Sequence, residues 1–171
     1  MSACQTTVDA FLARDFKSWM GLPAGCAEQD ITREYAFREG FGAARRGKAQ
    51  VESRFKVLSH PGFASGVEFH FSDDKLQFLE TEFWSNDPDE YSRIVALVGE
   101  PSHQLEFHWR DWCVPSGLRL WPQLGISAGL AEKTGLIVCM TVFSPCTREV
   151  FEQRYYQTSG SREFRRSNRD G

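Results

Sequence analysis

The chain has 171 residues, of which 41% are hydrophobic and 25% are charged, and its formal net charge is −3 at pH 7. This length supports one sizeable core and is short for two independent ones. The pI near 5.8 excludes a surface that is basic overall, as is typical of proteins that bind nucleic acid or anionic membranes. No apolar run approaches the roughly 18–20 residues that span a bilayer, and residues 1–15 lack a secretory signal pattern, so we expect a cytoplasmic protein that binds neither nucleic acid nor membrane.

The cysteines are odd in number and widely spaced, and no pair is separated by only two residues. They are Cys4, Cys26, Cys113, Cys139 and Cys146. This pattern predicts free thiols in a reducing compartment rather than a disulfide framework or a zinc site.

The first half of the chain predicts two helices followed by three strands. A helix capped by Thr6 or Thr7 runs to about Trp19, and a second covers residues 28–38. Residues 42–50 form a basic loop, and strands follow at 51–58, 66–72 and 75–84. The last two strands are joined by a tight-turn sequence at 72–75, which predicts a β-hairpin.

The second half predicts a helix over residues 88–98 and strands at 103–110, 117–124 and 135–143. Gly125 and Gly129 loosen the connection between the last two strands. A final helix covers residues 146–157, and residues 158–171 have the composition of a disordered tail.

Landmarks of the first half recur in the same order 51 to 60 residues later, which suggests a duplicated unit. Phe41-Gly42 recurs as Val98-Gly99, residues 51–55 as 105–109, Ser65-Gly66-Val67 as Ser116-Gly117-Leu118, and the run ending at Phe83 as the run ending at Phe143. We therefore predict a single α+β domain over residues 1–157. It contains a pseudo-repeat of helix-plus-three-strand units at 28–84 and 88–143, and helices pack against one face of an antiparallel sheet in two layers.

The short helix that ends in Val98-Gly99-Glu100-Pro101 and is followed by a meander resembles the units of β-lactamase inhibitor proteins and of the outer-membrane lipoprotein BamE. The resemblance in the order of elements covers residues 28–143 and implies tandem α+β units that bind other proteins. The first of the two predicted units differs from this motif, because Phe41-Gly42-Ala43-Ala44 stands where the motif has Gly-Glu-Pro. The order of strand 75–84, helix 88–98 and three strands is also similar to the vicinal-oxygen-chelate proteins, whose paired modules form cupped metal or drug sites.

Two predicted strands share the tripeptide Glu-Phe-His, at Glu68–His70 and at Glu106–His108. Because side chains alternate along a strand, each glutamate shares a face with the following histidine. If both strands belong to one sheet, Glu68, His70, Glu106 and His108 could converge for metal binding or acid–base catalysis. The alternative is that they are solvated cross-strand pairs.

A second group of candidates lies where the strand near residue 109 ends: Trp109, Arg110, Asp111 and Trp112, with Trp121 beyond. These side chains could line an aromatic cleft or anchor a partner protein, or the tryptophans could cap the core. Cys113, close to His108 and Asp111 in the sequence, is a candidate nucleophile without a family signature around it.

The sequence therefore predicts a non-catalytic binding module for a small aromatic ligand or a partner protein, with no cofactor and no assigned metal site. The alternatives are a metal-assisted or acid–base enzyme that uses the Glu/His face, and a structural protein that assembles through a sheet edge.

Overall fold

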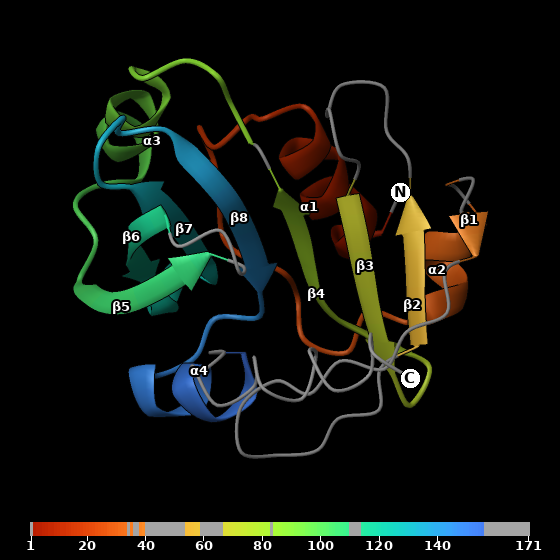
Figure 1. The fold of residues 1–171 in the computed structure, drawn as a ribbon. Coiled ribbons are helices and arrows are strands. Elements are labelled where there is room, and N and C mark those ends of the chain that lie inside the picture. Colours follow the sequence, from red (N-terminus) through yellow and green to blue (C-terminus); the bar gives the residue numbers. More distant parts are fainter. Residues whose placement is uncertain are drawn as a thin grey trace, which may run out of the picture.

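The computed structural model describes residues 2–33, 35, 38–39, 54–58, 67–82, 84–109 and 114–155, and for residues 32, 38–39, 54–58, 82, 107–109 and 114–116 it describes the backbone alone. The elements are α1 (Ala3–Leu12), α2 (Glu28–Thr32), β1 (Arg38–Glu39), β2 (Arg54–Leu58), β3 (Val67–Ser72), β4 (Lys75–Glu82), α3 (Glu90–Val98), β5 (His103–Trp109), β6 (Val114–Trp121), a 3-10 turn (Pro122–Leu124), β7 (Ile126–Ala131), β8 (Ile137–Phe143) and α4 (Arg148–Arg154) (Figure 1). The α+β prediction is confirmed.

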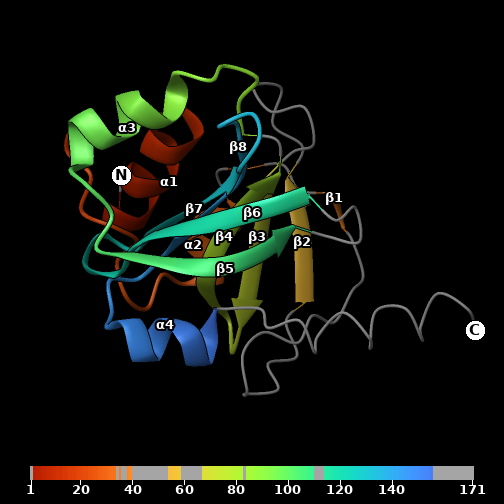
Figure 2. The same ribbon diagram turned by 60° about the vertical axis from the view of Figure 1, so that its left-hand side comes forward.

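The strands form one eight-stranded sheet in the order β1-β2-β3-β4-β8-β7-β6-β5. Neighbouring strands are antiparallel throughout, and the central contact joins β4 to β8. Each half of the sheet is thus a four-stranded meander that follows the chain order. In Figure 2 the β5 and β6 strands run across the direction of β2, β3 and β4, which shows how strongly the sheet twists.

One face of the sheet packs against α1, α2 and α3. Alternate residues of β3, β7 and β8 point into this core, among them Phe69, Ile126 and Met140, and Phe11 of α1 and Ile94 of α3 meet them from the helices. The largest fully buried side chain in this layer is that of Trp84, whose ring centroid lies 5.1 Å from that of Phe11 and 5.8 Å from that of Phe16. This apolar layer fixes the orientation of the sheet relative to the three helices.

The opposite face of the sheet packs against α4. Phe151 and Tyr155 join Phe78, Leu118, Leu120 and Phe143 in a separate apolar cluster. The ring centroids of Phe143 and Tyr155 are 4.9 Å apart. Helices therefore lie on both faces of the sheet, whereas the sequence predicted them on one.

We expect the first turn of α4 to be stabilised by Thr147, whose side-chain oxygen accepts a hydrogen bond from the Val150 N–H at 3.3 Å. Thr147→Ala removes this cap and should lower the free energy of unfolding by about 1 kcal/mol. Urea denaturation of the two proteins measures the difference, and an unchanged midpoint would show that α4 needs no cap.

Several predicted elements differ in extent from those observed. The helix expected to end at Trp19 ends at Leu12, and the helix expected over 28–38 ends at Thr32, so that Arg38–Glu39 form β1 instead. The connection that contains Gly125 and Gly129 is largely strand β7, which pairs with both β6 and β8. The predicted basic loop 42–50 and tail 158–171 lie outside the described residues.

The predicted repeat is not confirmed: it equates described segments that lie at unlike positions in the sheet, and its landmark Phe41-Gly42 lies outside the described residues. Of the segment 51–55, the described residues 54–55 belong to β2, second from one edge, whereas residues 105–109 belong to β5, which is itself an edge strand. The segments that close near Phe83 and Phe143 lead through the central strands β4 and β8 and do match.

No helix in the described part of the chain is both long and apolar enough to cross a membrane.

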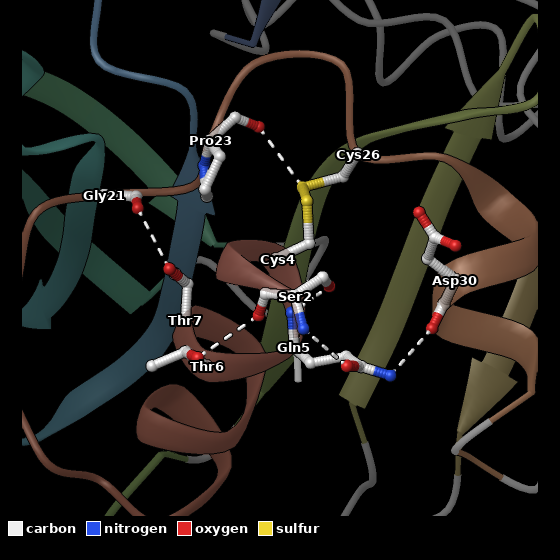
Figure 3. The surroundings of a disulfide bond; sticks show 9 residues. All are labelled: Ser2, Cys4, Gln5, Thr6, Thr7, Gly21, Pro23, Cys26 and Asp30. Atoms are coloured by element: carbon white, nitrogen blue, oxygen red, sulfur yellow. Dashed lines mark hydrogen bonds between the residues drawn. A yellow bond between two sulfur atoms is a disulfide. The ribbon is translucent and has the colours of Figure 1, made fainter.

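The prediction that all cysteines are free is wrong for Cys4 and Cys26, which form a disulfide (Figure 3). Helix α1 begins with a capping box between Ser2 and Gln5, and Cys26 lies in the segment that leads into α2. Packing brings the two segments together although the cysteines are 22 positions apart in the sequence. Cys139 and Cys146 are not part of a disulfide, as predicted.

Candidate functional site

The β3–β4 hairpin brings two carboxylates and an imidazole together. The strands are joined at Asp73-Asp74, where both residues have positive φ angles (51° and 58°), as in the tight turns that favour right-twisted hairpins. A β-bulge at His70/Phe71 shifts the register, so that His70 lies opposite Phe78 and Glu68 opposite Glu80. Because of this bulge, Glu80 shares a face with Glu68 and His70.

The three side chains form a compact cluster of possible metal ligands. His70 Nε2 lies 3.5 Å from an oxygen of Glu68 and 3.8 Å from an oxygen of Glu80, and the three ligand atoms all lie within 4.8 Å of one another. The imidazole is fully buried, whereas the exposed fraction of the side chain is 12% for Glu80 and 35% for Glu68. Glu68 therefore connects a buried site to solvent.

Two further buried polar residues extend the cluster across the sheet. Glu80 lies directly opposite Thr141 of β8, and Thr141 lies opposite Ser127 of β7. Their exposed fractions are 6% for Thr141 and 2% for Ser127. Direct cross-strand partners project from the same face of a sheet, so two hydroxyl groups continue the polar row that starts at Glu68 and Glu80.

Aromatic packing holds the imidazole in place. The rings of His70 and Phe78 stack with centroids 3.9 Å apart. The ring of Phe78 in turn packs against that of Tyr155, with centroids 5.8 Å apart. Burial raises the pKa of the Tyr155 phenol, so this ring stays neutral at physiological pH. The aromatic cluster under α4 therefore forms one wall beside the site.

The structure does not bring the two Glu-Phe-His strands together. They belong to one sheet, but four strands separate β3 from β5, which corresponds to about 24 Å along the sheet. Glu106 is also exposed on the opposite face, because His103 and Leu105 of β5 are the residues that share a face with Glu80. The side chain of His108 lies outside the described residues.

Trp121 lies in the core beneath α3. Its side chain is 3% exposed, its indole N–H donates a hydrogen bond to the Gly99 carbonyl at 2.8 Å, and its ring lies 6.3 Å from that of Tyr91. This is the position expected for a tryptophan that caps the core. The side chains of Trp109, Arg110, Asp111, Trp112 and Cys113 are outside the described residues, so their predicted roles stay predictions.

Glu80 is the site residue that the sequence analysis missed. The signal for it is a change in phase along β4, where Leu76 and Phe78 alternate but Leu79 is apolar as well. A bulge between Leu76 and Phe78 accounts for this change in phase, and shifting the hairpin register there by one residue moves Glu80 to the face of His70.

Comparison with known proteins adds no family to these observations. Neither a protein-family model, nor a curated protein, nor a solved structure matches this chain. Its functional assignment therefore depends on the geometry of the β3–β4 site alone.

Proposed function

We propose that this protein binds a divalent transition-metal ion, with Zn²⁺ the first candidate, through Glu68, His70 and Glu80. The observation that carries the proposal is the convergence of three ligand atoms within 4.8 Å of one another around a fully buried imidazole. Imidazole and carboxylate are ligands that suit Zn²⁺, Fe²⁺ and Mn²⁺ in proteins.

The distances within the cluster support a single ion. Ligand atoms about 2.0–2.1 Å from a tetrahedral Zn²⁺ are about 3.3 Å from one another. The two distances from His70 Nε2, 3.5 and 3.8 Å, exceed this value by only a few tenths of an ångström. Small rotamer adjustments of the two glutamates would close the site around the ion.

The charges of the cluster also favour a cation. Glu68 and Glu80 are directly opposed across two strands, and like charges in this arrangement destabilise a sheet. A divalent ion between them neutralises both carboxylates. With three protein ligands, one coordination position remains for water or a small molecule, as in catalytic zinc sites, and the Thr141 and Ser127 hydroxyls lie on that face.

This proposal places the binding function on the sheet rather than on the loop after β5. A metal-assisted reaction at the remaining coordination position is the alternative function, and it needs the same three ligands. Binding of an aromatic molecule or of a partner protein through residues 109–112 stays a separate proposal.

Metal titration of the untagged full-length protein tests the proposed function. After treatment with a chelator, we expect one equivalent of Zn²⁺ or Co²⁺ per chain by calorimetry and native mass spectrometry. Bound Co²⁺ should give the intense visible absorption of a tetrahedral site. His70→Gln should weaken binding by at least about 100-fold, because a lost ligand costs more than the 10–100-fold typical of a lost outer-shell partner.

His103→Gln is the matched control, because His103 is half-buried on β5 at the far edge of the same sheet. The affinity of the His103→Gln variant for Zn²⁺ should equal that of the wild-type protein. Equal affinities for wild type and His70→Gln, or no stoichiometric binding at all, would rule out the proposed site.

A further inference from the structure

The disulfide and the candidate metal site are connected through the turn of one hairpin. The segment that contains Cys26 lies along the β3–β4 turn: the Leu76 N–H donates to the Cys26 carbonyl at 2.8 Å, and the Glu28 N–H donates to the Asp74 carbonyl at 2.8 Å. Ala27 forms an antiparallel bridge with Lys75 between these two bonds. We refer to residues 26–28 and their three contacts as the clasp.

The disulfide attaches the clasp to a fixed part of the core. Cys4 belongs to α1, whose Val8 and Phe11 are fully buried. Figure 3 shows the bond from Cys4 of α1 to Cys26, with Pro23 beside it. The Gln5 side chain adds a hydrogen bond of 3.3 Å to the Asp30 carbonyl, just beyond the clasp. Loss of the disulfide would therefore remove the covalent part of this attachment.

The turn held by the clasp has an unfavourable backbone conformation. Asp73 and Asp74 both adopt positive φ angles, which non-glycine residues seldom do. The two hydrogen bonds and the bridge supply part of the free energy that keeps the turn in this form. Their weakening would let the turn sample other conformations.

The register shift of β3 lies between this turn and His70. The bulge is at His70/Phe71, and Phe71 pairs with Leu76, whose N–H is held by the clasp. A bulge determines which side chains share a face, and Glu80 is opposite Glu68 only in the shifted register. The geometry of the metal site therefore depends on the conformation that the clasp stabilises.

We propose that the oxidation state of Cys4 and Cys26 regulates metal affinity, with the disulfide form binding the ion more tightly. This inference rests on the proposed metal site. Reduction transfers two electrons and two protons from a dithiol, which becomes a disulfide, and leaves Cys4 and Cys26 as two thiols. The released clasp then holds the turn and the bulge less firmly, and the three ligands are less well positioned.

The test compares the affinity for Zn²⁺ of the oxidised full-length protein with that of Cys4→Ala/Cys26→Ala. This double variant lacks both the disulfide and the thiols that could themselves bind zinc. We expect a loss of affinity in the range of coupled sites, about 5- to 150-fold. Cys146→Ala is the matched control, because Cys146 is a free thiol outside the clasp and should not affect the affinity.

If the double variant does not fold, a second measurement on the wild-type protein tests the proposal. Wild-type protein reduced with a phosphine is titrated with Co²⁺, and hydrogen exchange of the Leu76 and Glu28 amides is followed without metal. Weaker Co²⁺ binding together with faster exchange supports the proposal. Equal affinity of the oxidised and reduced proteins overturns it and leaves the metal site intact, whereas no metal binding by the oxidised protein overturns the proposed function itself.

Discussion

Gly125→Ala should lower the free energy of unfolding by about 3–5 kcal/mol, because both backbone strain and a steric clash oppose the methyl group. Gly125 follows the 3-10 turn between β6 and β7 with a φ angle of +62°. A Cβ atom there would lie 2.0 Å from the Phe143 carbonyl oxygen, at the end of β8. The Phe143 N–H also donates to the Gly125 carbonyl at 2.8 Å, so the two segments cannot separate without losing this bond.

Gly135→Ala separates the two contributions. Gly135 has a similar φ angle of +68°, but a Cβ there would have no neighbour within 4 Å among the described residues. This variant should lose only the roughly 1–2 kcal/mol that the left-handed conformation costs an ordinary residue. Urea unfolding of both variants gives the difference, and equal losses would show that the close approach of β8 to Gly125 is not a constraint.

The strand β7 shows why part of the fold is not predictable from local sequence. Residues 126–131 read Ile-Ser-Ala-Gly-Leu-Ala, and their small side chains and two nearby glycines are typical of a loop. In the sheet they are buried and paired on both sides, where small residues suit the close packing of β6 and β8. Tertiary packing therefore determines the conformation here, whereas the β3–β4 hairpin follows from its alternation and its turn.

The candidate site was predictable in the same partial way. Alternation along β3 correctly places Glu68 and His70 on one face. Their third partner depends on a bulge, and the separation of Glu106 from them depends on the order of strands, which the chain order does not determine. The disulfide was missed for a related reason, since only packing brings Cys4 to Cys26.

A second large change in stability is expected where the polar side chains of His70 and Glu80 are buried in the sheet. We expect His70→Leu to lower the free energy of unfolding by about 1–3 kcal/mol, because it removes a buried polar group 3.8 Å from the carboxylate of Glu80. His70→Leu/Glu80→Met removes both polar groups and fills similar volumes. Its stability without metal should equal that of the wild type or exceed it by about 1–4 kcal/mol.

This double variant distinguishes a functional cluster from a structural one. If Glu68, His70 and Glu80 are present to bind an ion, the double variant keeps the fold and loses Zn²⁺ binding, and added Zn²⁺ raises the melting temperature of the wild-type protein alone. Thermal unfolding with and without Zn²⁺ measures both effects. If the double variant were as unstable as His70→Leu, the pair would contribute to folding itself. The polar groups on this face of the sheet would then be explained by stability rather than by a bound metal.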